Sequence, residues 1–382
     1  MLIIYGVAGT GKSTYMADLI RKEKRSFMVL AATHAAVDNI FKIVGTIDRK
    51  YFSTLYSFFR IDYINNIVKG SIKHVDVIYI DEFSLLNKYL FATCIKKSPR
   101  TEFILCGDPL QLNAIYDDNE SITFTELRKL KGLSPLAVEH YHLGVFGIPE
   151  IQKAKKVILK NVYRNEDSVK EIMNKIFIEN DDKFLNYPFI PFNEVIDRLN
   201  NPNYNYVVLA SKYSILQEVY NELNFVSNNK YTVTIKQRGD GGFSRLYLYE
   251  NQELIITENT EQYYNGQRVY FIDYNKTDDS IYVKSEQGEI MKIKKIMFDF
   301  PLMPANLLTI HKSQGVTLDH VILCINELFD ISMLYTALTR AKKEILFYTR
   351  IEKPYDEKVK ILFENAYVDI HNELKELYYK EK

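Results

Sequence analysis

The first fourteen residues contain the densest group of side chains that could do chemistry. They include Gly6-Val-Ala-Gly-Thr-Gly-Lys-Ser-Thr14, which has the G-x-x-x-x-G-K-[ST] spacing of a phosphate-binding loop. Glycines let such a backbone turn so that its N–H groups point at phosphate oxygens. The lysine can reach the β- and γ-phosphates, and the serine hydroxyl can bind Mg²⁺. The predicted nucleotide-binding residues are Gly6, Ala8, Gly9, Thr10, Gly11, Lys12, Ser13 and Thr14.

A phosphate-binding loop lies between a strand and a helix, and the segments on either side of this loop have those two patterns. Met1–Tyr5 is apolar and predicts a strand, and Tyr15–Lys22 has a helical pattern. A helix that begins at the loop adds the positive end of its dipole to the phosphate site. This strand–loop–helix context distinguishes the motif from a chance match.

A pair of carboxylates follows another predicted strand. The apolar run Val77–Ile80 leads directly into Asp81 and Glu82. In a chain with a phosphate-binding loop, we expect Asp81 to bind Mg²⁺ together with Ser13, and Glu82 to orient or deprotonate the attacking water. The alternative interpretation is an ordinary turn at a strand end with solvated carboxylates.

A third strand also ends in a polar turn. Phe103–Leu112 contains Gln111, which could reach a γ-phosphate and report its presence. Alone this is weak, because the Gly-Asp-Pro sequence before it is also typical of turns.

Apolar strands and amphipathic helices alternate through the first part of the chain. Strands are predicted at Leu2–Tyr5, Phe27–Ala32, Val75–Ile80 and Phe103–Cys106, and a helix around Leu86–Ile95. This alternation predicts an α/β fold with a doubly wound parallel sheet. The phosphate-binding and carboxylate-bearing turns should then lie together at the carboxyl ends of the strands.

A second α/β unit is predicted after Val157. Its expected strands and helices are Tyr206–Ala210, Ile215–Leu223, Leu307–Ile310, Val321–Ile325, about Leu334–Lys342, and Ile345–Tyr348. Between them, residues 228–301 contain short β-rich runs separated by turn residues, which predicts a small inserted antiparallel β-barrel. We therefore expect a first lobe at 1–143, a second lobe at 144–227 and 302–382, and the barrel at 228–301.

The composition of the chain limits the class of protein but does not indicate a binding partner. The 382 residues include 49 basic and 49 acidic side chains, so net charge does not indicate a nucleic-acid partner. Cys94, Cys106 and Cys324 stand in apolar runs without metal-ligand spacing and are expected to be reduced core residues. No apolar run is as long as a membrane span and no signal peptide precedes the first strand, which predicts a cytoplasmic protein without a membrane partner.

Two further segments change the class of protein that the sequence predicts. They are Thr309-Ile-His-Lys-Ser-Gln-Gly-Val-Thr317 and Tyr335-Thr-Ala-Leu-Thr-Arg-Ala341, and the second is predicted to place Arg340 on a helix. With the phosphate-binding loop, Asp81-Glu82, Gly107-Asp-Pro-Leu-Gln111 and Asn161-Val-Tyr-Arg164, they resemble the ordered motifs of superfamily 1 helicases. The segments Ala31–Ala36 and Ser53–Phe58, with the β-rich insertion, resemble subfamily B, the Dda and RecD group of 5′→3′ translocases.

This resemblance implies a fold of two RecA-like lobes and an NTP-dependent motor. ATP and Mg²⁺ are the implied cofactors, and the implied partner is a single-stranded nucleic acid, DNA rather than RNA. A monomeric motor is expected, with replication proteins as candidate partners.

The resemblance also implies roles for individual residues. Arg164 and Arg340 would contact the γ-phosphate from the second lobe, and Gly315 joins the nucleotide-binding residues. The residues implied to lie along the single strand are Thr33, His34, Thr54, Thr309 and His311.

Two departures from the family pattern matter. The chain begins only five residues before Gly6, without the usual glutamine-bearing segment that recognises adenine, so other NTPs are expected to serve besides ATP. The strand-separating pin, at about residues 58–74, is short, and Phe59 or Tyr63 could form a wedge, although Phe59 could equally belong to the core. The alternatives are a viral-type RNA helicase and a non-catalytic, NTP-gated nucleic-acid-binding factor.

Overall fold

The computed structural model describes residues 1–62, 67–68, 74–112, 144–174, 176, 189–201, 205–223, 231–235, 244–325, 328 and 331–349. These residues form two compact units. The first lies within Met1–Asp181 and Asp330–Thr339, and the second lies within Asp182–Phe329 and Arg340–Ile361. We describe each unit by itself.

A parallel six-stranded sheet organises the first unit. Its order is β3-β2-β6-β7-β1-β8, and every neighbouring pair is parallel. The strands are β1 (Leu2–Gly6), β2 (Phe27–Ala31), β3 (Phe52–Thr54), β6 (Val77–Asp81), β7 (Glu102–Gly107) and β8 (Lys155–Leu159). Because all run the same way, the turns after β1, β6 and β7 lie at one edge of the sheet.

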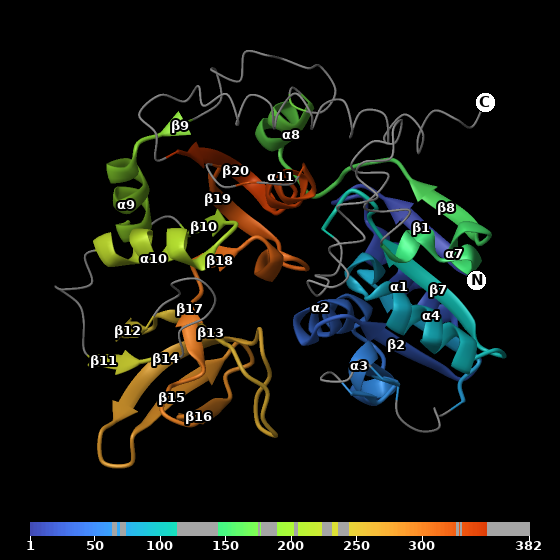
Figure 1. The fold of residues 1–382 in the computed structure, drawn as a ribbon, viewed down its shortest axis with the longest axis horizontal. Helices are drawn as coiled ribbons and strands as arrows, with labels where there is room; N and C mark the ends of the chain where they lie inside the picture. Colours follow the sequence, from blue (N-terminus) through green and yellow to red (C-terminus); the bar gives the residue numbers. More distant parts are fainter. Residues whose placement is uncertain are drawn as a thin grey trace. The chain divides into compact units, whose positions relative to one another are not determined.

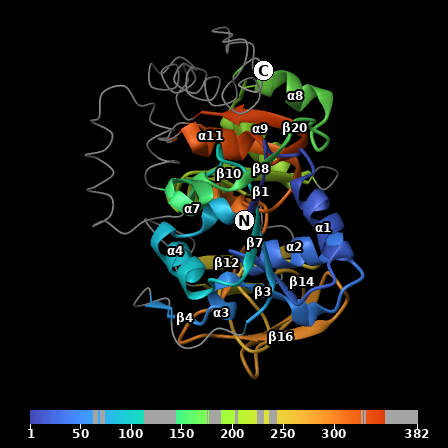
Figure 2. The ribbon, with the colours of Figure 1, turned by 90° about the vertical axis from the view of Figure 1, so that its right-hand side faces the viewer.

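Helices cover both faces of this sheet (Figure 2). One face packs against α1 (Lys12–Lys22) and α2 (His34–Val44), and the other against α3 (Leu55–Phe58), α4 (Lys88–Lys97) and α7 (Pro149–Gln152). Residues Ile3 and Ile4 of β1 therefore belong to opposite cores. Burial on both faces explains the continuous apolar runs in these strands.

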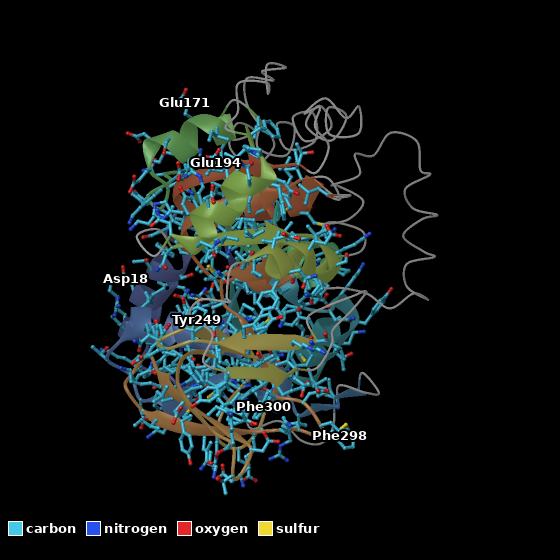
Figure 3. The ribbon with its side chains drawn as sticks, turned by 90° about the vertical axis from the view of Figure 1, so that its left-hand side faces the viewer. Asp18, Glu171, Glu194, Tyr249, Phe298 and Phe300 are labelled. Atoms are coloured by element: carbon cyan, nitrogen blue, oxygen red, sulfur yellow. The ribbon has the colours of Figure 1, made fainter. Side chains whose placement is uncertain are left out.

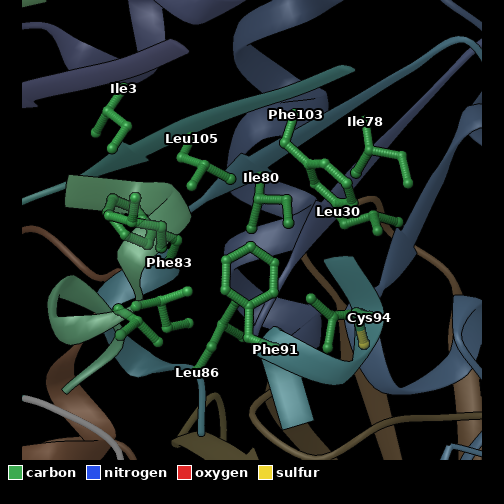
Figure 4. Packing of buried hydrophobic residues seen from close by; sticks show 14 of the residues in the cluster. Ile3, Leu30, Ile78, Ile80, Phe83, Leu86, Phe91, Cys94, Phe103 and Leu105 are labelled. Carbon is green, nitrogen blue, oxygen red and sulfur yellow. The ribbon is translucent and has the colours of Figure 1, made fainter. Parts of the chain in front are cut away.

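The core beneath α4 is built from aliphatic and aromatic side chains (Figure 4). Ile80 and Leu105 point from the sheet towards Phe91 of α4, which packs edge to face on Phe103 with ring centroids 6.0 Å apart. Phe59 is also fully buried in this core, at 0% exposure. The wedge interpretation of Phe59 is therefore wrong, and Tyr63 lies outside the described residues. After Phe59, strands β4 (Ile61–Asp62) and β5 (Ile67–Val68) form a short antiparallel pair.

A second parallel sheet organises the second unit (Figure 1). Its order is β18-β10-β19-β20-β9, and the strands are β9 (Phe189–Ile190), β10 (Tyr206–Ala210), β18 (Leu307–Thr309), β19 (Leu318–Cys324) and β20 (Ala341–Tyr348). Helices α9 (Phe192–Asn200) and α10 (Tyr213–Glu222) accompany it. The predicted α/β fold with two parallel sheets is confirmed.

The predicted insertion is antiparallel. Strands β11 (Tyr231–Thr234) and β12 (Arg245–Leu248) pair with each other. The other five strands form a sheet in the order β16-β15-β14-β13-β17: β13 (Glu253–Ile256), β14 (Arg268–Asn275), β15 (Ser280–Ser285), β16 (Ile290–Lys294) and β17 (Leu302–Pro304). Near its end, Phe300 is buried whereas Phe298 is exposed to solvent (Figure 3).

Two elements differ from the expectation from sequence. Strand β8 pairs with β1, although the expected boundary at residue 143 assigns it to the second lobe. Helix α11 (Ile331–Leu338) ends before Arg340, because the chain turns at Thr339 and enters β20 beside β19. The prediction that Arg340 lies on a helix is therefore wrong. The exact domain boundaries stay a prediction.

Among the described residues, no helix is long and apolar enough to cross a membrane. The three cysteines, Cys94, Cys106 and Cys324, are free thiols and are buried in the fold, as predicted.

Candidate active site

Two carbonyl groups of the loop after β1 accept hydrogen bonds from side chains that follow them in the chain. The Lys12 ammonium donates to the Gly6 carbonyl at 2.8 Å and to the Val7 carbonyl at 3.1 Å. The Thr10 hydroxyl also donates to the Val7 carbonyl, at 2.8 Å. The lysine therefore lies folded over the loop, at the N-terminus of α1.

Glycine is required at particular positions of this loop. Gly9 and Gly11 have φ values of 81° and 80°, in the left-handed region that other residues rarely adopt. A Cβ on Gly6 would lie 2.4 Å from the Thr10 hydroxyl oxygen and 2.9 Å from the Leu159 carbonyl oxygen. The compact turn predicted from the three glycines is thus the one that forms.

The predicted metal-binding pair meets at the edge of the sheet. Ser13, in the first turn of α1, donates its hydroxyl to Asp81 Oδ2 at 2.8 Å. Asp81 ends β6 and is only 3% exposed. Burial, together with the neighbouring Glu82 charge, raises the pKa of Asp81 to about 6.

Glu82 is held in an unusual backbone conformation next to this pair. Its φ is 51°, and its N–H donates to Asp81 Oδ1 at 3.0 Å. Its Oε2 atom is buried, and within the described part of the chain no group donates a hydrogen bond to it. A buried carboxylate oxygen that receives no hydrogen bond from the described residues is suited to accept a proton or a hydrogen bond from a bound water molecule.

These groups fit a magnesium-bound nucleotide. Mg²⁺ binds oxygen ligands, usually one or two carboxylate or hydroxyl groups together with phosphates and water. The Ser13 hydroxyl and the Asp81 carboxylate supply such oxygens at one point, and the loop supplies N–H groups and an ammonium for the phosphates.

The turn after β7 contributes a buried polar group of its own. Gln111 is 2% exposed, and its side-chain amide donates to Asp108 Oδ2 at 3.2 Å. Asp108 is 1% exposed, and burial raises the pKa of its carboxyl. The structure therefore places Gln111 in a hydrogen-bonded turn at the same sheet edge as Asp81.

The two predicted arginines occupy different surroundings. The segment before Arg164 is attached to the loop, because the Tyr163 N–H donates to the Gly9 carbonyl at 2.8 Å. Arg164 thus lies in the first unit, which differs from the expected position in the second lobe. Arg340 lies in the second unit, where it is 1% exposed and donates to the Val316 carbonyl at 3.4 Å, next to Gly315. Contact of either arginine with phosphate stays a prediction.

The predicted strand-binding residues of the first unit lie at neighbouring strand ends. Thr33 follows β2, Thr54 ends β3, and the two strands are paired through Ala31 and Thr54. Each hydroxyl caps a helix: Thr33 accepts from the Ala36 N–H and Thr54 from the Ser57 N–H, both at 3.2 Å. Burial lowers the pKa of His34, the first residue of α2, so this imidazole is biased towards its neutral form.

The second unit repeats part of this arrangement. Thr309 ends β18, which pairs with β10 through Ala210. Its hydroxyl accepts from the Lys312 N–H at 3.4 Å, and His311 begins the short 3₁₀ turn that follows. In both units, therefore, the predicted residues lie at the carboxyl ends of adjacent parallel strands.

One buried group near the loop was not identified from the sequence. The Tyr335 hydroxyl of α11 donates to Asp108 Oδ2 at 3.0 Å and accepts from the Ala8 N–H at 3.3 Å. Tyr335 opens the Tyr-Thr-Ala-Leu-Thr-Arg segment, but only Arg340 was expected to act there. The signal was present in that motif, since a tyrosine in an otherwise apolar helix needs a buried partner for its hydroxyl.

The two parallel sheets and the phosphate-binding loop resemble those of superfamily 1 helicases. The AAA domain family model matches residues 1–124, and the UvrD-like helicase C-terminal domain family model matches residues 304–348. The resemblance to this class, expected from the ordered motifs, is confirmed.

Within this class the chain is similar to Pif1 helicases. It is 21% identical over 413 residues to the ATP-dependent DNA helicase Pif1 of Campylobacter jejuni, covering 89% of this chain and 86% of that protein. A Bacteroides Pif1 helicase in complex with ADP-AlF3 and ssDNA matches with a TM-score of 0.66 and 20% identity, over 98% of this chain and 93% of that one. Pif1 from Candida albicans matches with a TM-score of 0.60 and 17% identity, over 98% and 95%. These structures share the fold.

The raised pKa of Asp81 leads to a prediction about stability. Its pKa in the folded protein, about 6, lies above its ordinary value of 3.8, so the ionised carboxylate destabilises the folded state above pH 6. In the absence of Mg²⁺ and nucleotide, Asp81→Asn should therefore raise the free energy of unfolding at pH 8, by roughly 1–3 kcal/mol. The gain should shrink as the pH falls from about 6 to about 4, where the parent carboxyl becomes protonated.

Urea unfolding at pH 8, 6 and 4.5 measures this difference. A suitable control is Asp76→Asn, because hydrogen bonds from Ser26 lower the pKa of Asp76 and the sign should reverse. Equal or lower stability of Asp81→Asn at pH 8 would show that the buried charge is not a cost to the fold.

Proposed function

We propose that this protein is an ATP-dependent DNA helicase that translocates 5′→3′ on single-stranded DNA. The observation that carries the proposal is the meeting of the Ser13 hydroxyl with the buried Asp81 carboxylate, beside Glu82 and the phosphate-binding loop. The similarity to Pif1 helicases supports DNA as the nucleic acid.

Each group at the site has a proposed part in hydrolysis. Lys12 would exchange its two loop carbonyls for β- and γ-phosphate oxygens, and Ser13 and Asp81 would hold Mg²⁺. When bound, Mg²⁺ neutralises phosphate charge. Glu82 would orient the attacking water and accept its proton, and Gln111 would contact the γ-phosphate. Arg164 and Arg340 would stabilise the charge that develops on the transferring group.

Two sets of residues are proposed to hold the single strand. Thr33, His34 and Thr54 belong to the first unit, and Thr309 and His311 to the second. Hydrolysis would alternate the grip of the two sets along the DNA backbone. The helix N-termini that Thr33 and Thr54 cap present backbone N–H groups, which suit phosphate contacts.

The polarity and the nucleic acid can be tested in one unwinding experiment. DNA and RNA duplexes with a single 5′ or 3′ overhang are each incubated with the protein, ATP and Mg²⁺. We expect opening of the DNA duplex with a 5′ overhang only. Strand binding should weaken with salt, by about 0.7 in log K per phosphate contact for each tenfold increase.

Each of the other outcomes of this experiment would indicate a different polarity or a different function. Opening from the 3′ side alone would overturn the proposed polarity. Opening of RNA alone would indicate a viral-type RNA helicase. NTP-dependent strand binding without phosphate release would indicate a non-catalytic binding factor.

A further inference from the structure

A chain of buried hydrogen bonds joins the phosphate-binding loop to the turn that bears Gln111. The Ala8 N–H donates to the Tyr335 hydroxyl, and that hydroxyl donates to Asp108 Oδ2. The same carboxylate oxygen accepts from the Gln111 amide at 3.2 Å. All four residues belong to the first compact unit and are at most 2% exposed.

A second contact fixes the same turn to the same helix. The Leu112 N–H donates to the Thr336 hydroxyl at 3.1 Å. Thr336 is fully buried and adjoins Tyr335 in α11. Helix α11 is therefore tied to residues 108–112 by two side chains, and one of these side chains also contacts the loop.

The Tyr335 hydroxyl both donates a hydrogen bond and accepts one. Its proton goes to Asp108, and its oxygen receives the Ala8 N–H. Asp108 in turn fixes the side-chain amide of Gln111 by accepting from its NH₂ group, which leaves the amide oxygen facing elsewhere. Loss of the hydroxyl would release Gln111 and the loop N–H together.

We propose that Tyr335 is a positioning residue that makes the nucleotide site selective for a γ-phosphate, by holding Gln111 and the loop at Ala8 in register. This inference rests on the proposed function and adds a residue to it. Tyr335 stands five positions before Arg340 in the chain, so the helix that contacts the loop at Ala8 leads directly to the proposed arginine finger.

The test uses Tyr335→Phe, which keeps the ring and removes only the hydroxyl. Affinities for fluorescent ADP and for a non-hydrolysable fluorescent ATP analogue are measured with Mg²⁺ on the full chain. We expect the affinity for the ATP analogue to fall about tenfold, as for one lost hydrogen bond in a charged network, and the affinity for ADP to stay within about twofold. Thr336→Val should act in the same direction.

Tyr220→Phe is the matched control. Tyr220 is equally buried, at 1% exposure, and its hydroxyl accepts from the Tyr247 N–H at 2.8 Å within the second unit. This variant also loses a hydroxyl that takes part in a hydrogen bond, but its ADP and ATP-analogue affinities should equal those of the parent.

A double variant tests whether Tyr335 acts through Gln111. In a Gln111→Ala background, Tyr335→Phe should weaken binding of the ATP analogue by less than it does in the parent, because the part of the effect that acts through Gln111 is already lost and only the contact with the Ala8 N–H remains. Equal losses for ADP and the ATP analogue, no loss for either, or additive effects in the double variant would overturn the proposal. Binding is measured without unwinding, so a failure of the helicase function would be seen separately, in the duplex assay.

Discussion

Replacing Arg340 with alanine is expected to lower single-strand-stimulated ATP hydrolysis by about 10³–10⁵, the range for arginine fingers. A guanidinium group that contacts the transferring phosphate stabilises charge that grows in the transition state. Arg340 is 1% exposed, its carbonyl accepts from the Leu318 N–H at 2.9 Å, and its guanidinium donates to the Val316 carbonyl at 3.4 Å. Such a group is preorganised rather than free to search for its target.

The measurement is phosphate release with and without single-stranded DNA. Because Arg340 is buried, circular dichroism and thermal unfolding must show that the variant is folded. Arg198→Ala is a matched control, since Arg198 also lies in the second unit but pairs with Glu194 and Tyr206. Normal stimulated hydrolysis by a folded Arg340→Ala protein would exclude Arg340 from the phosphate site.

The sequence predicted the buried strands well because burial leaves a strong signal. Strand β10 forms over Tyr206–Ala210, as expected, and all five of its residues are buried. Strand β1 extends only one residue beyond the predicted range. Both strands lie between two neighbours of a parallel sheet, so both of their faces are covered and the apolar run is unambiguous.

In the sequence, edge strands and short turns have a weaker signal than buried strands. Strand β8 begins with Lys155 and Lys156, which are exposed at the sheet edge, and so it was not predicted. The run that contains Arg340 satisfies a helical pattern, but pairing of β20 with β19 draws Ala341 into the sheet. Long-range pairing overrides local preference there.

The site was predicted where residues belong to motifs of recognisable spacing, and missed where no motif indicates the partner. Ser13 and Asp81 belong to motifs with known spacing, and the structure brings these two predicted metal-binding side chains together in a hydrogen bond. The bond from Tyr335 to Asp108 joins residues 227 positions apart. Nothing in either segment specifies the other as its partner, so this contact required the fold.

Glu82→Gln and Lys12→Ala should separate turnover from binding. Glutamine keeps the size of Glu82 and can still contact a water molecule, but it cannot accept a proton, so hydrolysis should fall by about 10²–10⁴ while nucleotide affinity stays within a few fold. The geometry favours this outcome, since Glu82 Oε2 is buried and receives no hydrogen bond from the described residues. Its positive φ also holds the side chain beside Asp81.

Lys12→Ala should instead lose the nucleotide itself. The Lys12 ammonium already lies over the loop, bonded to Gly6 and Val7, and its removal leaves the β- and γ-phosphates without their nearest cation. Equilibrium binding of a fluorescent ATP analogue and steady-state phosphate release, measured on both variants, give the two readouts. The expected pattern is tight binding with slow turnover for Glu82→Gln, and weak binding for Lys12→Ala. Hydrolysis at the parent rate by Glu82→Gln would assign proton acceptance to another group, because the isosteric amide leaves every other contact in place.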